Sequence, residues 1–267
     1  MTRPVFATKR RPAAGAATGR LRGFGNLWRQ EAAAWTRTRA RWLQPLLWVG
    51  LLNGLMTFPL VFMRDLFASE FGGPAVAATD MFFSLAALAT AAGAILLAHG
   101  AILGERQQGT AAWVLSKPVA RTAFVLAKFA ALSVGLLLTA VTLPAAIAYA
   151  LLSFEGGAPL AVGRFAAAAG ILALSLTWYL ALTVMLGTLL DARAAVLAIP
   201  LASLVGGDVL IAAWGGFGML GPWVLGRAAS LLAQGGPLLS AWPLVATAVG
   251  AVSFVGVALW RFERQEL

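Results

Sequence analysis

The chain has no cysteine and only one histidine, His99. Without cysteine it can form neither a disulfide framework nor a cysteine-ligated metal site, and one histidine cannot build a histidine cluster. Charged residues are also scarce: they make up 11% of the 267 residues, against about a quarter of a soluble domain. Hydrophobic residues make up 60%. This composition predicts an all-α polytopic membrane protein with no cofactor or metal of its own.

Acidic residues are half as numerous as basic ones, so the net charge is +10. A basic balance can indicate nucleic-acid binding, but ten of the 20 Lys and Arg precede residue 42. A basic flank before an apolar segment is typical of a membrane anchor that faces anionic lipid. The chain also lacks the motifs of nucleic-acid-binding folds. We therefore expect membrane lipids, and no nucleic acid, among its partners.

Long apolar runs dominate the rest of the chain. A membrane-spanning α-helix needs about 20 apolar residues, and only helices or closed barrels satisfy their backbone hydrogen bonds in lipid. The runs are continuous, with no alternation of polar and apolar residues, so we predict helices. Six stretches are long enough: 43–63, 78–103, 124–152, 165–190, 194–214 and 241–260.

The basic residues predict the orientation of these six spans. With the N-terminus inside, 17 of the 20 basic residues lie on the inner side, and three lie outside: Arg64, Arg164 and Arg227. Such a bias marks the cytoplasmic side. We therefore expect a multi-pass protein of the bacterial cytoplasmic (inner) membrane with both termini in the cytoplasm.

Two further segments lie outside the six spans in this prediction. Residues 1–20 are expected to form a basic flexible tail, and residues 21–42 an amphipathic helix in the membrane interface, because Trp28, Trp35 and Trp42 recur every seven residues. Residues 43–267 then form the six-span domain. Residues 215–240 are too apolar for a solvated loop, and Gly221–Pro222 can start a helix. Short helices in the outer leaflet are expected there, between spans five and six.

A polar segment, residues 104–123, separates spans two and three and faces the cytoplasm in this topology. Gly109 permits a tight entry to a short helix, and Thr110 is placed to cap it with its side chain. Pro118 disfavours helix at the preceding residue and so ends it. The helix would expose an apolar tip formed by Trp113, Val114 and Leu115. Exposed apolar residues rimmed by charge usually mark a contact site.

This segment carries a family pattern: Gly104-Glu105-Arg106, Gly109-Thr110, Leu115-Ser116, Pro118-Val119, Arg121 and Lys128-Phe129. The pattern resembles the ABC-2 type permease family, and in particular the group of the nitrous-oxide-reductase maturation permease. The run LGTLLDARAAVLA, residues 186–198, resembles the short cytoplasmic turn before span five in such permeases. Six spans, an interfacial helix and an outer insertion extend the resemblance to most of the chain.

The resemblance implies a membrane subunit that works as a homodimer, or with a related permease, on two separate ABC ATPase subunits. ATP and Mg²⁺ would be bound by those subunits, and this chain has no phosphate-binding loop of the form GxxxxGK(S/T). It would not be an enzyme by itself. The segment at 104–123 would be the coupling helix, with Trp113, Val114 and Leu115 as anchors and Glu105, Arg106 and Arg121 at the rim. Export of a hydrophobic or amphipathic substrate is expected, with small inorganic species as the family's alternative.

Acids in or near the spans allow a second function. Asp80 and Asp208, with His99, could serve an ion-coupled secondary transporter, although such sites favour the membrane midplane and broken helices. In a permease, the two acids would instead line or gate the outer end of the pathway. An intramembrane aspartyl protease is disfavoured, because Val205 stands where the Gly-x-Gly-Asp motif needs its first glycine.

Glycines in two spans predict close helix packing. Gly50 and Gly54 form a Gly-x-x-x-Gly pair in span one, and Gly206 and Gly207 lie in span five. Small residues let helix backbones approach each other in membranes, either within one chain or between two copies.

Overall fold

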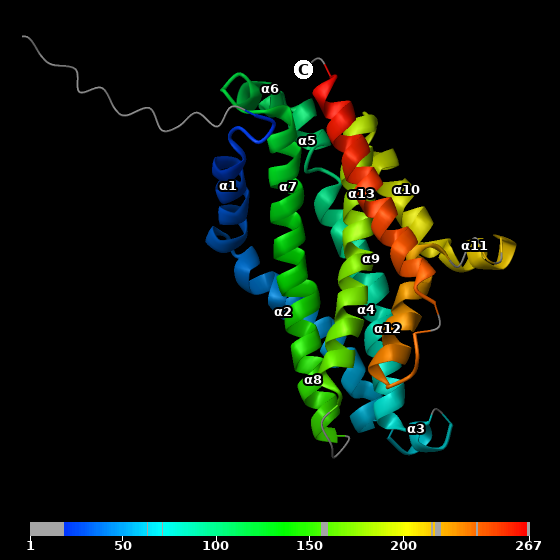
Figure 1. Cartoon of the computed structure of the whole chain (residues 1–267). Helices are drawn as coiled ribbons and strands as arrows, with labels where there is room; N and C mark the ends of the chain where they lie inside the picture. The colour runs from blue at the N-terminus through cyan, green and yellow to red at the C-terminus, as the bar shows by residue number, and fades with distance from the viewer. Residues whose placement is uncertain are drawn as a thin grey trace, which may run out of the picture.

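The computed structural model describes residues 19–62, 64–70, 72–155, 160–214, 216, 220–238 and 240–265. All the regular structure in these ranges is helical, with no strand among them, which confirms the all-α part of the predicted fold class. The tail predicted at 1–20 lies almost wholly outside the described residues. The helices pack side by side into an elongated bundle (Figure 1).

The elements in chain order are α1 (Phe24–Arg37), α2 (Ala40–Thr57), the π-helical turn η1 (Phe58–Phe62), α3 (Arg64–Glu70), α4 (Pro74–Ala98), α5 (Leu103–Gln107), α6 (Thr110–Leu115), α7 (Arg121–Leu136), the π-helical turn η2 (Leu137–Thr142), α8 (Leu143–Glu155), α9 (Val162–Leu189), α10 (Arg193–Val205), α11 (Gly207–Trp214), the 3₁₀ turn η4 (Pro222–Val224), α12 (Leu225–Ala233) and α13 (Trp242–Glu263). The end of the bundle that carries α5, α6 and the last turn of α13 is called the α5–α6 end, and the opposite end is called the α3 end (Figure 1).

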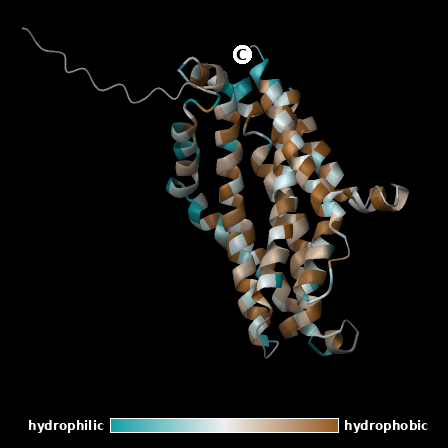
Figure 2. Cartoon of the chain, in the orientation of Figure 1, coloured by the Kyte–Doolittle hydropathy of each residue, from teal (hydrophilic) through white to brown (hydrophobic). Residues whose placement is uncertain are grey.

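Within the described residues, five helical runs are long and apolar enough to cross a membrane: Arg41–Phe62, Pro74–Gln107, Arg121–Glu155, Val162–Leu189 and Trp242–Glu263. They coincide with five of the six predicted spans. Hydrophobic residues cover most of the length of these helices, and hydrophilic residues are commoner toward the two ends and on α1 (Figure 2). Length and hydropathy were therefore sufficient to locate these five.

The prediction of one continuous span at 194–214 is wrong. Helix α10 has 13 residues, which is about 20 Å of helix and short of the roughly 30 Å hydrocarbon core. The chain then turns at Gly206, and α11 projects away from the bundle (Figure 1). The indole of Trp223 explains the turn: a Cβ on Gly207 would lie 2.1 Å from its Cδ1. The same indole donates a 2.6 Å hydrogen bond to the carbonyl of Ser203.

The insertion after α11 contains short helices, and Pro222 stands at the first position of η4. Their place in the outer leaflet stays a prediction. Helix α12 packs against both α4 and α9. Its buried face includes Leu225, Ala229 and Ala233, and a Cβ on Gly226 would lie 2.8 Å from the Cβ of Ala87. Helix α12 is thus part of the bundle wall.

The helix predicted at 21–42 is interrupted. Helix α1 ends at Arg37, and Thr38 adopts an extended backbone while its hydroxyl donates to the carbonyl of Ala34 at 2.7 Å. A threonine that bonds back to the preceding turn competes with helix continuation. Trp42 therefore belongs to α2, and the three tryptophans do not lie on one helix.

The core forms around α9, which touches α4, α12 and α13. Aromatic pairs join neighbouring helices: the rings of Phe83 and Phe165 lie 5.3 Å apart between α4 and α9, and those of Phe124 and Phe262 are stacked at 5.4 Å between α7 and α13. Such pairs contribute about 1 kcal/mol each beyond area burial. The Phe124–Phe262 pair holds α7 and α13 together near the α5–α6 end.

Candidate functional site

The polar segment between α4 and α7 forms a helical hairpin, α5 and α6. Gly109 joins the two helices with a φ of 71°, a left-handed conformation that glycine adopts without strain. The prediction that the side chain of Thr110 caps α6 is wrong, because Gly109 occupies the N-cap position and no side-chain cap bond forms. Helix α6 ends at Leu115, three residues before Pro118.

The centre of the site is a buried cation. The ammonium of Lys128, on α7, lies 2.6 Å from a carboxylate oxygen of Glu31 on α1 and 2.5 Å from one of Glu105 on α5. Only 5% of Lys128 is exposed. Charge-assisted hydrogen bonds this short are the strong ones, and a buried ammonium needs them to offset its lost hydration. Lys128 therefore ties three helices together.

The guanidinium of Arg106 fixes the other side of α5. It donates to two backbone carbonyls at the end of α9, at 3.1 and 3.2 Å, and to Asp191 Oδ1 at 2.8 Å. The neighbouring Gln107 donates to the carbonyl of Asp191 at 2.9 Å and accepts a 3.0 Å bond from Arg193 Nε. Helix α5 is thus attached to the turn between α9 and α10.

The end of α13 is attached to the same assembly. Arg121, the first residue of α7, donates to the carbonyls of Glu263 at 3.1 Å and of Gln265. Gln265 is buried and donates to the carbonyl of Thr188, in the last turn of α9, at 2.5 Å. Backbone bonds also join the residues before α1 to the start of α7, since Ala120 N–H donates to the carbonyl of Arg22 at 2.9 Å.

The outer surface of the hairpin presents one large apolar side chain. Trp113 is 62% exposed, and the ammonium of Lys117 lies 3.7 Å from its ring centroid. The predicted tip of three exposed apolar residues is smaller than expected, because Val114 and Leu115 are partly buried against the core. Trp113 therefore stands on a base that the core and the ion pairs hold in place.

The residues considered for ion coupling do not come together. Asp80 is exposed on α4, and His99, the residue after the end of α4, follows it by 19 positions, about 28 Å along the axis. The imidazole Nδ1 lies 2.7 Å from the carbonyl of Leu96. Asp208 lies in α11, and its side chain is not among those the structure describes. The arrangement of Asp80 and His99 does not favour a proton relay.

The glycine pairs have different surroundings. Gly50 and Gly54 are exposed on α2, and a Cβ on either would meet nothing within 4 Å. They leave a shallow strip on the outside of α2. Gly206 and Gly207 lie instead at the break between α10 and α11, where Gly207 lies beside Trp223.

Sequence reasoning assigned no role to Glu31, Asp191 or Gln265, and it gave Lys128 no partners. One signal was available for Lys128: it is a single cation within the predicted span 124–152, and an ionisable residue in an apolar segment is a functional candidate by default. The partners could not be read from the sequence, since Glu31 is 97 positions away.

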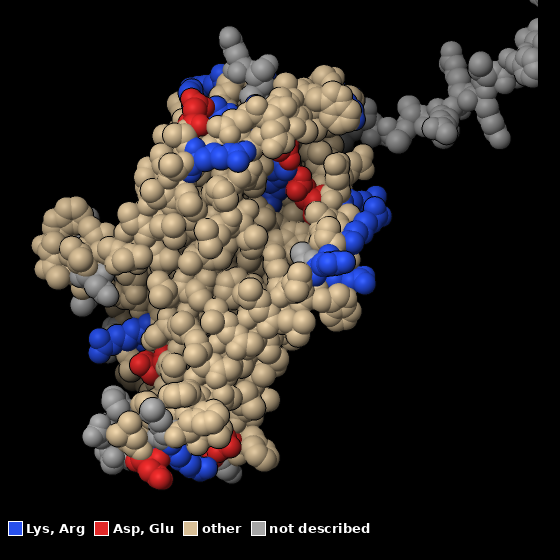
Figure 3. All heavy atoms as spheres, turned by 180° about the vertical axis from the view of Figure 1, so that it is seen from behind, with Lys and Arg blue, Asp and Glu red and all other residues tan. Residues whose placement is uncertain are grey.

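Charged residues gather mainly toward the two ends of the molecule. Figure 3 shows acidic and basic atoms meeting in a recess near the α5–α6 end, and a second charged group at the α3 end. At the α3 end, a pocket of about 230 Å³ is lined by Arg64, Asp65 and Glu155, among others, and Arg64 pairs with Glu155 at 3.5 Å. Neither Asp80 nor Asp208 lines this pocket.

The family model described as ABC-2 family transporter protein matches residues 38–220, from the end of α1 to the beginning of η4. The matched region includes the α5–α6 hairpin and most of the residues that hold it. No curated protein matches the chain. Because the match covers more than half of its length, the chain is a multi-pass membrane protein that belongs to the ABC-2 family of transporter proteins.

Proposed function

We propose that the chain is the permease subunit of an ABC transporter and that the α5–α6 hairpin is the coupling element on which an ATPase subunit docks. The observation that carries the proposal is the contrast within this hairpin. Its base is fixed by Lys128 and Arg106, while Trp113 remains 62% exposed at its tip. Membership of the ABC-2 family supports ABC ATPase partners in general.

The geometry is suited to transmitting force. A movement of the ATPase against Trp113 would pass through α6 and α5 into the ends of α4 and α7. The ion pair of Glu105 with Lys128 links that movement to α1, and the contacts of Arg106 link it to α9 and α10. Well-packed helices move as rigid units, because protein interiors deform little. The hairpin would therefore act as a lever on most of the bundle.

The rest of the transporter follows from the same proposal. The α5–α6 end would face the cytoplasm of a bacterial inner membrane, two permease copies (or one and a related permease) would sit on two ATPases, and ATP with Mg²⁺ would bind only to the latter. The spanning helices carry few charges, which suits export of a hydrophobic or amphipathic substrate. The Gly50–Gly54 strip on α2 offers one surface for a second copy.

The test is co-purification of the cognate ATPase with a Trp113→Ala variant. Removal of a large exposed anchor at the centre of an interface costs about 2 kcal/mol or more, which is roughly a thirtyfold loss of affinity. The matched control is Trp242→Ala, since Trp242 is 70% exposed at the other end of α13. The control variant should bind the ATPase like the wild type.

The melting temperature of each isolated variant must stay close to that of the wild type, so that loss of binding reports the surface alone. Full ATPase binding and full transport-coupled ATP hydrolysis by Trp113→Ala would show that α6 is not the docking element. Equal losses for both variants would show that the effect is not specific to the hairpin.

A further inference from the structure

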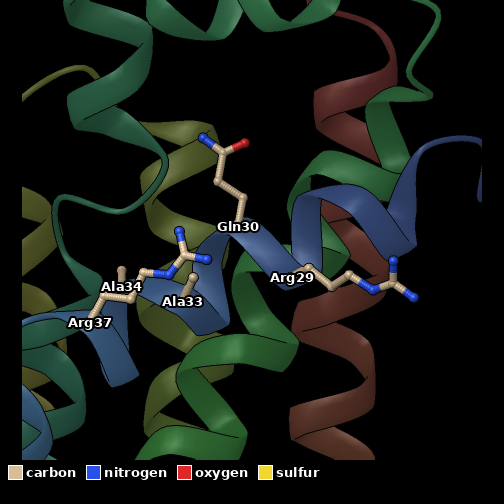
Figure 4. A pocket seen from close by; sticks show the side chains of 5 residues that line it. All are labelled: Arg29, Gln30, Ala33, Ala34 and Arg37. Atoms are coloured by element: carbon tan, nitrogen blue, oxygen red, sulfur yellow. The ribbon is translucent and has the colours of Figure 1, made fainter.

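We propose that the outward face of α1 is a binding site for the headgroup of an anionic phospholipid. The site is a pocket of about 470 Å³ lined by Arg29, Gln30, Ala33, Ala34 and Arg37 (Figure 4). The pocket lies on the face of α1 away from the Lys128 ion pairs. Lipid binding there does not depend on the proposed role of the α5–α6 hairpin.

Helix α1 has two faces with different environments. Its inner face packs on α7: Leu27 contacts the core, Glu31 pairs with Lys128, and Trp35 lies so close to Gly135 that a Cβ there would be 2.6 Å from the indole. The pocket residues recur at helical spacing on the other side. With one face fixed to α7, the other remains open to a ligand.

The charge of the pocket selects an anion. Arg29 and Arg37 make no hydrogen bond or ion pair with any residue that the structure describes, whereas Arg106 and Arg121 at the same end are bonded to protein oxygens. No acidic side chain lines the pocket. Guanidinium groups match phosphate oxygens in geometry and charge, and an amide such as Gln30 can donate to the same group.

The shape of the pocket leaves room for such a group. Figure 4 shows the guanidinium of Arg37 turned back over Ala33 and Ala34, with Gln30 standing beside them and Arg29, at the other end, extended away from them. The two alanines form a low floor between the long side chains. Arg29 and Arg37 are eight residues apart, or about 12 Å along the axis, so their flexible side chains can reach one headgroup from opposite sides.

The neighbouring helix indicates that the anion belongs to a lipid. Helix α2 begins three residues after Arg37, and its first turns expose Trp42 at 65%, Leu43 at 61%, Leu46 at 67% and Leu47 at 58%. These residues open the first membrane-spanning run, Arg41–Phe62. Basic and aromatic residues that precede an apolar span are typical of the headgroup region. A phospholipid bound here would place its phosphate on α1 and its acyl chains along α2.

The experiment measures lipid binding to the full chain in a neutral detergent. Short-chain phosphatidylglycerol is titrated against wild type and against Arg29→Gln/Arg37→Gln, with the zwitterionic phosphatidylcholine of equal chain length as the reference lipid. Two basic residues at an anionic surface account for roughly thirtyfold in affinity, and we expect the double variant to lose that much. The matched control is Arg227→Gln/Arg261→Gln, which removes two exposed arginines elsewhere and should change the affinity less than threefold.

Three outcomes would overturn the proposal. One is equal affinity of wild type and Arg29→Gln/Arg37→Gln for phosphatidylglycerol. Another is displacement of phosphatidylglycerol by free glycerol phosphate at the same concentration. That result would assign the pocket to a soluble phosphate compound. The third is a double variant, Arg29→Gln/Arg37→Gln, that binds lipid like the wild type but no longer co-purifies with the ATPase. That result would assign the two arginines to an acidic protein surface.

Discussion

Lys128 holds three helices at one point, because its ammonium is shared by a carboxylate from α1 and one from α5. One cation between two anions is stable only while all three groups are present. Removing the cation leaves two carboxylates facing each other, and removing all three charges leaves a neutral contact. This asymmetry gives a test that separates the ion pairs from the packing around them.

Lys128→Met should lower the free energy of unfolding by about 2 kcal/mol. A fully buried pair broken on one side costs about 3–5 kcal/mol, and the value is smaller here because the side chains of Glu31 and Glu105 are 32% and 28% exposed. The triple variant Lys128→Met/Glu31→Gln/Glu105→Gln should recover more than half of the loss. Thermal unfolding in detergent measures both. A triple variant no more stable than Lys128→Met would mean that the carboxylates are not what Lys128 stabilises.

Asn53 presents the opposite case, a buried polar group without a partner. It is 4% exposed in α2, and neither Oδ1 nor Nδ2 bonds to any described residue. A buried group left unpaired costs about 1–3 kcal/mol. Asn53→Leu, which is similar in size, should therefore raise the melting temperature of the isolated chain, and Asn53→Asp should lower it. A lower melting temperature for Asn53→Leu would show that the amide is hydrogen-bonded in the native protein.

At the scale of the element, the docking of α1 depends on a missing side chain. The indole of Trp35 occupies the space that a Cβ on Gly135 of α7 would take, at a separation of 2.6 Å. A side chain at position 135 cannot fit without moving α1, because it would meet the ring carbons of Trp35. The Glu31–Lys128 pair lies about one turn away on α1 and about two turns away on α7, so it would move too.

Gly135→Leu should displace α1, and Gly135→Leu/Trp35→Ala should restore it. The readout is a cysteine placed at Leu27, a partly buried position on the inner face of α1, in a chain that has no cysteine of its own. In Gly135→Leu we expect the labelling rate of this cysteine to rise about tenfold. That factor corresponds to a decrease of roughly 1.4 kcal/mol in the free energy needed to expose it. Gly170→Leu is the control, because a Cβ on Gly170 would meet nothing within 4 Å. Labelling at the wild-type rate in Gly135→Leu would contradict the tight contact.

The elements also show what could be predicted from the sequence. Five spanning helices were located because length and hydropathy are local properties of the chain. The break at Gly206 involves Trp223, 17 residues later in the chain. The contact of its indole with Gly207 and its hydrogen bond to Ser203 are tertiary interactions that a local pattern cannot predict. The prediction that Thr110 caps α6 was wrong for a local reason: Gly109, the preceding residue, takes the N-cap position with its left-handed backbone. The ion pairs of Lys128 join segments 97 and 23 positions apart, and no local pattern encodes them.

At the scale of the whole molecule, we expect the broken segment α10–α12 to take the place of the missing span. Helix α9 ends and α10 begins at the α5–α6 end, and α13 also ends there, since Arg121 binds its last carbonyls (Figure 1). Helices α10 and α12 both pack against α4 and α9. Their 13 and 9 residues together give about 33 Å of helix, close to the hydrocarbon thickness of roughly 30 Å. Two short helices in line can therefore cross where one continuous helix was expected.

This arrangement predicts that the tip of α6 and the end of α13 lie on the same side of the membrane. Single cysteines at Ser116 and Arg264, both exposed, should react together with an impermeant thiol reagent, while one at Val162, exposed at the α3 end, should react only from the other side. The distribution of basic residues predicts that Ser116 and Arg264 lie inside, so intact cells should label Val162→Cys alone, and inverted vesicles should show the reverse pattern. Labelling of Ser116→Cys and Arg264→Cys from opposite sides would mean that α10–α12 does not complete a crossing. Such a result would place the hairpin and the end of α13 on opposite sides of the bilayer. It would contradict the hydrogen bond from Arg121, at the start of α7, to the carbonyl of Glu263, at the end of α13.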